Sequence, residues 1–167
     1  MRFADRPTTE TDVYVAAPPA AIWPLVTEIA MPSRFGTELR EASWIDPENS
    51  PCLGARFVGR NCHPAGGEWE TTSTVVEFEP ERRFAWAVGD PDHPSAVWRL
   101  ELAPDGEGTR LRYWAQMGPG PSGTTRVIEQ MPDKEERIIA RRLEEWQRGM
   151  RAVLEGIRSE AESAPGG

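Results

Sequence analysis

The chain of 167 residues is long enough for one domain that buries about 70% of the surface of its unfolded chain. Its net charge of −8 disfavours a sequence-independent grip on nucleic acid or on an anionic membrane, because both need clustered Lys and Arg. No apolar run approaches the roughly 20 residues of a membrane span, and the first ten residues lack the apolar segment of a signal peptide, so we expect a cytoplasmic protein.

The expected elements begin with a strand over residues 11–16 and a short helix from Ala17 through Trp23. Pro24 is expected to kink or end that helix, and a second short helical or turn segment covers residues 27–35. Six strands follow at 39–46, 54–62, 68–79, 83–88, 96–103 and 108–117. The turns between them are short and rich in Gly, Pro and Asp, which predicts an antiparallel meander.

Alternation along the strands predicts which side chains face the core. At 54–62 we favour the phase of Phe57, Gly59 and Asn61, because the other phase would bury arginine. The strand at 68–79 has two open phases, and we favour the one that buries the indole of Trp69. That phase presents Trp69, Thr71, Ser73 and Val75, and the alternative presents Thr72, Thr74, Val76 and Phe78. The later strands present Phe84, Trp86 and Val88, then Trp98, Leu100 and Leu102, then Leu111, Tyr113, Ala115 and Met117.

The last expected element is a helix from Asp133 to about Arg158, long enough to cross the whole domain. Its apolar residues recur at steps of four and three and form one stripe, made of Ile139, Leu143, Trp146, Met150, Val153 and Ile157. Asp133 is the expected N-cap, with Glu136 as its capping-box partner. Residues 159–167 are small and polar and read as a flexible tail.

Several short pieces carry a resemblance to a known family. They are Ala17-Pro18-Pro19 with Ile22-Trp23, Gly54 with Phe57, Trp69, Val75 with Glu77 and Pro80, Phe84-Ala85-Trp86, Trp98 with Leu100, and Gly108-Thr109 with Leu111. In this order they resemble the START/SRPBCC helix-grip superfamily, in its bacterial polyketide cyclase/dehydrase-like branch, over roughly residues 11–158. The resemblance implies a single α+β domain over residues 1–167. In it a curved seven-stranded antiparallel sheet, two short helices and the long C-terminal helix enclose a cavity.

The resemblance places a ligand in that cavity, between the sheet and the last helix. The expected lining is an aromatic wall with a few neutral polar groups, which suits a mostly apolar, aromatic or polyketide-like molecule. The expected contacts are Phe57, Asn61, Trp69, Thr71, Ser73, Trp86, Trp98, Tyr113, Met117, Trp146 and Met150. The alternative interpretation is that the seven tryptophans only fill the core.

The link of roughly 15 residues after Met117 is long for a connection to a helix, and long ordered loops are often lids. Gly120 and Gly123 are the expected hinges, and Val127, Ile128 and Met131 are expected to form one apolar helical turn over the mouth. A covering loop without a gating role is the alternative. The meander brings this link to the same end of the sheet as a group of charged and histidine side chains, His63, Asp90, Asp92 and His93.

Three classes of function remain open. The first is a binder of a small hydrophobic molecule, which we place first. The second is a cyclase or dehydratase of polyketide-like substrates, in which Tyr113 would donate a proton and Asn61 would hold an enolate oxygen. The third is a partner-binding module, with Trp44 and Trp114 as candidates for an exposed patch.

No motif in the sequence supports a metal or a cofactor. Hydrolase, zinc-protease and phosphate-binding signatures are all missing, and both histidines lie in expected turns. Cys52 and Cys62 are too few for a disulfide scaffold or a metal site, and we expect free thiols. The sequence does not determine the oligomeric state.

Overall fold

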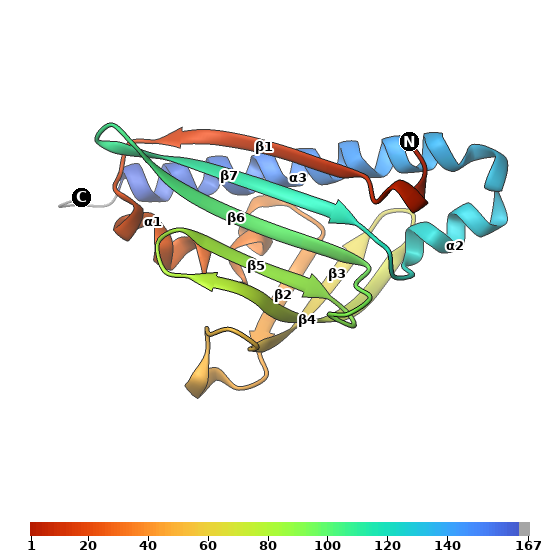
Figure 1. The fold of residues 1–167 in the computed structure, drawn as a ribbon, viewed down its shortest axis with the longest axis horizontal. Helices are drawn as coiled ribbons and strands as arrows, with labels where there is room; N and C mark the ends of the chain where they lie inside the picture. Colours follow the sequence, from red (N-terminus) through yellow and green to blue (C-terminus); the bar gives the residue numbers. More distant parts are fainter. Residues whose placement is uncertain (164–167) are drawn as a thin grey trace.

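A computed structural model describes residues 1–163. Seven antiparallel strands form one curved sheet in the order β1-β7-β6-β5-β4-β3-β2, and the helix α3 lies along one face of it (Figure 1). The strands are β1 (Thr8–Val15), β2 (Leu39–Trp44), β3 (Arg56–His63), β4 (Gly67–Glu79), β5 (Arg83–Val88), β6 (Ala96–Asp105) and β7 (Gly108–Met117). The α-helices are α1 (Pro19–Val26), α2 (Gly123–Gln130) and α3 (Glu135–Ser163), and four 3₁₀ helices are η1 (Phe3–Asp5), η2 (Met31–Phe35), η3 (Pro47–Asn49) and η4 (Pro132–Lys134). The predicted α+β helix-grip architecture is confirmed.

The apolar stripe of α3 faces the sheet as predicted. Ile139, Met150, Val153 and Ile157 are buried on it, and the helix packs mainly on β1 and also on η2 and α1. The α-helix begins two residues after the predicted N-cap, because η4 occupies residues 132–134. It continues to residue 163, so the first part of the predicted tail, 159–163, is helical, and residues 164–167 lie outside the described residues.

Strand β4 combines both phases that the sequence left open. Ser73 and Val75 are almost completely buried, which confirms the favoured phase over the first part of the strand. A bulge between Val75 and Glu77 then shifts the register, so that Phe78 also faces inward. Glu77 therefore faces outward, where its carboxylate accepts a hydrogen bond from Arg99 Nε at 2.6 Å.

The prediction that Pro24 ends or kinks the first helix is wrong about its end. Pro24 lies inside α1, which continues to Val26. A proline lacks only its own N–H, so the helix loses one hydrogen bond to the carbonyl of Ala20. Burial of Ile22 and Val26 holds the turn on either side of it.

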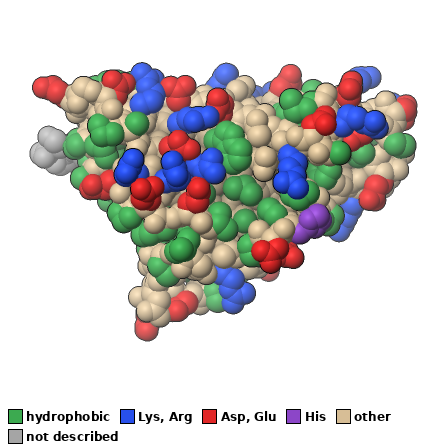
Figure 2. Space-filling view, in the orientation of Figure 1, with side chains coloured by type: hydrophobic (Ala, Val, Ile, Leu, Met, Phe, Trp, Pro, Cys, Tyr) green, Lys and Arg blue, Asp and Glu red, His purple; other side chains and the backbone are tan. Residues whose placement is uncertain are grey.

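The outer face of the sheet is charged. Across β1 and β7, Arg110 pairs with Asp12 at 3.1 Å, and Arg112 donates from Nε to Glu10 at 2.7 Å. Figure 2 shows acidic and basic side chains side by side on this face. Within residues 1–163 no helix is both long and apolar enough to cross a membrane.

Candidate functional site

Aromatic side chains form a continuous row across the inner face of the sheet and onto α3. The ring centroids of Phe57 and Trp86 are 6.1 Å apart, and those of Trp86 and Tyr113 are 6.4 Å apart. Trp98 continues the row, 5.8 Å from Tyr113 and 4.7 Å from Trp146 of α3. Trp86, Trp98 and Trp146 are only partly buried, so their rings border space that solvent reaches.

Four neutral polar side chains lie among these rings without a hydrogen-bond partner. Those of Asn61, Thr71, Ser73 and Tyr113 form no hydrogen bond with any described residue, although Ser73 and Tyr113 are only 2% and 5% exposed. Every side-chain oxygen or nitrogen that is sealed from solvent in the described residues has a partner. The free hydroxyls of Ser73 and Tyr113 must therefore face accessible space, where a ligand or water can satisfy them.

The register places these polar groups close together on β3 and β4. Asn61 pairs with Trp69, Gly59 with Thr71, and the inward phase predicted for β3 is confirmed by the burial of Phe57. A Cβ atom at Gly59 would lie 3.4 Å from Thr71 Oγ1 and 3.9 Å from Asn61 Nδ2. The same Cβ would lie 3.3 Å from Leu39 Cδ1, so Gly59 lets these two polar groups and Leu39 approach one another closely.

The structure brings the predicted contacts together on the inner face and on α3. Met117 and Met150 are 1% and 2% exposed and belong to the closed core. The more accessible members are Asn61, Trp69, Thr71, Trp86, Trp98 and Trp146. Whether any of them touches a ligand stays a prediction.

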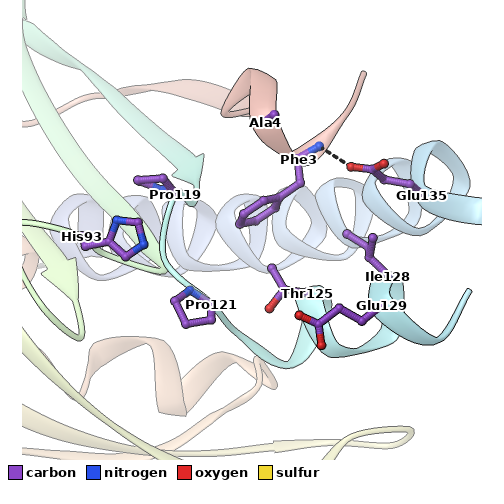
Figure 3. A pocket seen from close by; sticks show the side chains of 9 residues that line it. All are labelled: Phe3, Ala4, His93, Pro119, Pro121, Thr125, Ile128, Glu129 and Glu135. Atoms are coloured by element: carbon purple, nitrogen blue, oxygen red, sulfur yellow. Dashed lines mark hydrogen bonds between the residues drawn. The ribbon is translucent and has the colours of Figure 1, made fainter. Parts of the chain in front are cut away.

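Among the described residues, two of the hollows lie outside the space between the sheet and α3. The larger, of about 470 Å³, lies at one end of the molecule (Figure 3) and is lined by Phe3, Ala4, His93, Pro119, Pro121, Thr125, Ile128, Glu129 and Glu135. The smaller, of about 170 Å³, lies against β2 and β3 and includes the outward-facing Arg60. Between the sheet and α3, the rings of Trp98 and Trp146 contact each other.

The end hollow is bordered by the N-terminal segment. The Phe3 N–H donates to Glu135 Oε1 at 3.0 Å (Figure 3). Arg2 pairs with the same carboxylate, also at 3.0 Å. These bonds, that from Phe3 first, hold the pKa of Glu135 below its ordinary value. The phenyl ring of Phe3 covers Gly118, whose absent Cβ would lie 2.7 Å from it. The carboxylate of Glu135 is thus already occupied by Phe3 and Arg2 of the same chain.

The expected lid is a folded element. Residues 123–130 form α2, whose Ile128 lines the end hollow, while Val127 and Met131 are 38% and 36% exposed. The predicted hinges are not in the left-handed region, because neither Gly120 nor Gly123 has a positive φ. The Gly120 N–H instead donates to the Pro94 carbonyl at 2.7 Å, which ties this link to the β5–β6 turn.

A charged cluster joins α3 to the ends of β2 and β3. His63 Nε2 lies 2.5 Å from Glu145 Oε2, and Arg142 forms two bonds of 2.7 Å with the carboxylate of Glu38. Arg142 Nη1 also lies 3.7 Å from Glu145 Oε1. All four side chains are between 17% and 29% exposed.

The hydrogen bonds fix the proton of His63. Its Nδ1 accepts from the N–H of Ala65 at 3.0 Å and, less closely, from that of Gly66 at 3.3 Å. Amide N–H groups only donate, so Nδ1 carries no proton and Nε2–H donates to Glu145. Both ring nitrogens are thus in use, and His63 is not a free base.

The same bonds argue against a metal ion in this cluster. The donor atoms of Glu38, His63 and Glu145 lie within 4.8 Å of one another, a spacing that a cation could use. A metal on Nε2 would move the ring proton to Nδ1, against two amide N–H groups, and would meet the guanidinium of Arg142. The residues present do not fit a metal.

This cluster was not predicted from the sequence, although the inward position of His63 could have been inferred from the strand pattern. The inward phase of Phe57, Gly59 and Asn61 extends by two residues to His63, which the sequence pattern assigns to a turn. The partner Glu145, 82 positions further along the chain, could not be predicted from alternation.

The patch candidates of the third function class are corrected by the structure. Trp44 packs against Phe57, with ring centroids 5.5 Å apart, and Trp114 lies under the guanidinium of Arg99 at 4.6 Å. The exposed apolar side chains in this part of the chain are Ile45 and Leu53, at 48% and 66%. They lie on the segment that extends away from the sheet between β2 and β3 (Figure 1).

Comparisons with known proteins agree with this geometry. The family described as polyketide cyclase/dehydrase and lipid transport matches residues 6–162. The polyketide-cyclase-like protein Cgl2372 of Corynebacterium glutamicum is 30% identical over 93% of this chain and 91% of its own, with a TM-score of 0.66. A search of curated proteins finds no match.

More distant structures share the fold. The ZhuI aromatase/cyclase of Streptomyces sp. R1128 is 19% identical over 96% of this chain and 98% of its own, with a TM-score of 0.70. The protein TTHA0849 of Thermus thermophilus is 15% identical over 95% of this chain and 99% of its own, with a TM-score of 0.66.

Proposed function

The chain belongs to the polyketide cyclase/dehydrase and lipid transport family, and on that premise we propose that it binds a small, mostly apolar molecule of aromatic or polyketide-like type between the sheet and α3. The observation that carries this proposal is the set of unpartnered neutral groups among the aromatic rings, Asn61, Thr71, Ser73 and Tyr113. A core that only needed filling would gain nothing from polar groups without partners.

The ligand would displace side chains that now touch each other. The ring centroids of Trp98 and Trp146 are 4.7 Å apart with their planes tilted by 47°, and Arg142 lies 6.0 Å from the Trp146 ring. A planar ring that slides between the two indoles would keep their aromatic contacts and extend them. Its oxygen atoms would reach Asn61 and Thr71 on one side or Tyr113 on the other.

Binding without catalysis is favoured over the cyclase alternative. Burial raises the pKa of Tyr113, so its hydroxyl holds its proton more tightly than a free phenol and suits a hydrogen bond better than proton transfer. The ring of His63 is engaged at both nitrogens. Asn61 would then hold a ligand oxygen in either class of function.

The experiment is a binding titration with a matched pair of variants. Flavonoids, which are planar and carry carbonyl and hydroxyl groups, should change the tryptophan fluorescence and raise the melting temperature of the parent protein. Thr71→Val keeps the shape but removes the hydroxyl, and should weaken binding by about tenfold, the cost of one hydrogen bond. Thr72→Val, on the outward side of the same strand, should leave the affinity unchanged.

A panel of flavonoids, polyketides and fatty acids that moved neither the fluorescence nor the melting temperature would contradict the proposal. An equal loss of affinity in Thr71→Val and Thr72→Val would show that the ligand does not contact Thr71.

A further inference from the structure

The charged cluster of Glu38, His63, Arg142 and Glu145 borders the proposed binding space. His63 continues the inward phase of β3 two residues beyond Asn61. On the helix, Arg142 lies 6.0 Å from the ring of Trp146, which contacts the ring of Trp98 in a tilted arrangement. A ligand between the two indoles would therefore lie beside the cluster.

The cluster carries an uncompensated negative charge. The guanidinium of Arg142 is neutralised by the two 2.7 Å bonds to Glu38. Glu145 receives its closest hydrogen bond from a neutral imidazole, since Nδ1 of His63 accepts amide protons. The cluster thus holds two carboxylates and one guanidinium, which leaves one negative charge. These four side chains are partly buried, and charges on partly buried groups are screened less than charges on the open surface.

We propose that Glu38 and Glu145 make the inner site select uncharged ligands over anionic ones of the same shape. This inference rests on the proposed function and adds the chemical class of the ligand. The other groups available to a ligand there, Asn61, Thr71 and Ser73, are neutral and suit carbonyl, hydroxyl or amide groups. An anionic head would find the guanidinium of Arg142 already paired with Glu38, and would be repelled by Glu145.

The test compares two ligands that differ in charge alone. Neutral N-phenyl-1-naphthylamine, whose fluorescence rises in an apolar site, serves as the reporter, and 1-naphthamide and 1-naphthoate compete with it at pH 7. Competition confines the readout to the reporter's own site. In the parent protein the amide should displace the reporter at a concentration about tenfold lower than the carboxylate, the scale of one partly screened charge.

Glu145→Gln should reduce this gap to about twofold or less, because it removes the uncompensated charge. Glu144→Gln is the matched control, since Glu144 is the adjacent, exposed residue of α3, and the gap should stay as in the parent. Glu38→Gln is a second variant. Because it frees Arg142, 1-naphthoate should compete as well as 1-naphthamide in it, or better. The ratio within each protein cancels any change in stability.

A parent protein that binds both competitors equally would overturn the inference, as would a gap unchanged by both Glu145→Gln and Glu38→Gln. Failure of the reporter to bind the parent at all would instead contradict the proposed function. The two failures are therefore distinguishable.

Discussion

Gly120 shows how closely the link after β7 approaches the β5–β6 turn. A Cβ atom there would overlap the carbonyl oxygen of His93 and lie 2.8 Å from the carbonyl carbon of Pro94. The neighbouring Gly123 has no atom within 4 Å of its missing Cβ. The sequence could not separate these two roles, because both glycines stand in the same run of Gly, Pro and Ser.

Gly120→Ala should destabilise the protein by about 1–3 kcal/mol, since the backbone of the β5–β6 turn has to move away from the added methyl group. Gly123→Ala should be neutral or slightly stabilising, because it favours the first turn of α2. Urea denaturation of both variants measures the difference. Equal stabilities would contradict the role of Gly120 as a close-packing residue and would leave the hinge hypothesis in place.

At the level of single residues, alternation predicted the inner face well and the charged cluster poorly. Asn61 was placed on the inner face because the other phase of its strand would bury arginine, and Thr71 because the favoured phase of its strand buries the indole of Trp69. Phe78 was assigned to the less favoured phase, because a bulge inserts one residue without a clear sequence signal. The contacts of Glu38 and Glu145 could not be predicted in this way, because they form only where the start of β2 meets α3 in the folded protein.

At the scale of elements, the N-terminal segment is anchored to the start of α3. Glu135 accepts from the Phe3 N–H and from Arg2, and its side chain is only 14% exposed. The lowered pKa of Glu135 makes this anchor dependent on pH.

The anchor should be complete above the ordinary carboxyl pKa of 4.5 and should be lost as the pH falls through the lower pKa of the folded state. Protonation removes the charge that holds Phe3 N–H and Arg2, so the protection of the Phe3 amide against hydrogen exchange should fall in that range. In Glu135→Gln the protection should no longer change with pH. Glu136→Gln, an exposed neighbour, should behave as the parent does, and a parent amide equally protected at pH 3 and pH 6 would be inconsistent with this anchor.

Element order was the easiest feature to predict, and element ends were the hardest. The short turns between strands left little choice but an antiparallel meander, and the stripe on α3 fixed its inward face. Of helix α2, only one apolar turn made of Val127, Ile128 and Met131 was expected. In the structure the Ser122 N–H donates to Thr125 Oγ1 at 2.8 Å, which closes the first turn.

At the scale of the whole molecule, α3 supplies the cover for the sheet. Leu154 is 1% exposed, and Leu154→Ala should cost about 2–5 kcal/mol through the cavity that it leaves. Glu144→Ala on the exposed side of the same helix should change the stability by less than about 0.5 kcal/mol. Thermal or urea unfolding measures both.

A chain that ends at Pro132 should be insoluble or molten. It loses several buried side chains, each worth about 1.5–3 kcal/mol, and together they exceed the stability of a typical domain. Near-ultraviolet circular dichroism and a melting curve test this expectation. A soluble product with a cooperative transition would show that the sheet does not depend on α3.

The pairing of β1 with β7 has a consequence for protein synthesis. Asp12 and Arg110, which meet across this pair, are 98 positions apart in the chain. Of the seven strands of this sheet, β1 is made first and has no partner until β7, the last of them, has been made, and α3, which packs on β1, follows later still. Closing so long a loop is slow, and the nascent chain exposes the apolar inner face while it waits. The sheet can therefore close and be covered only late in translation, after β7 and α3 have been made.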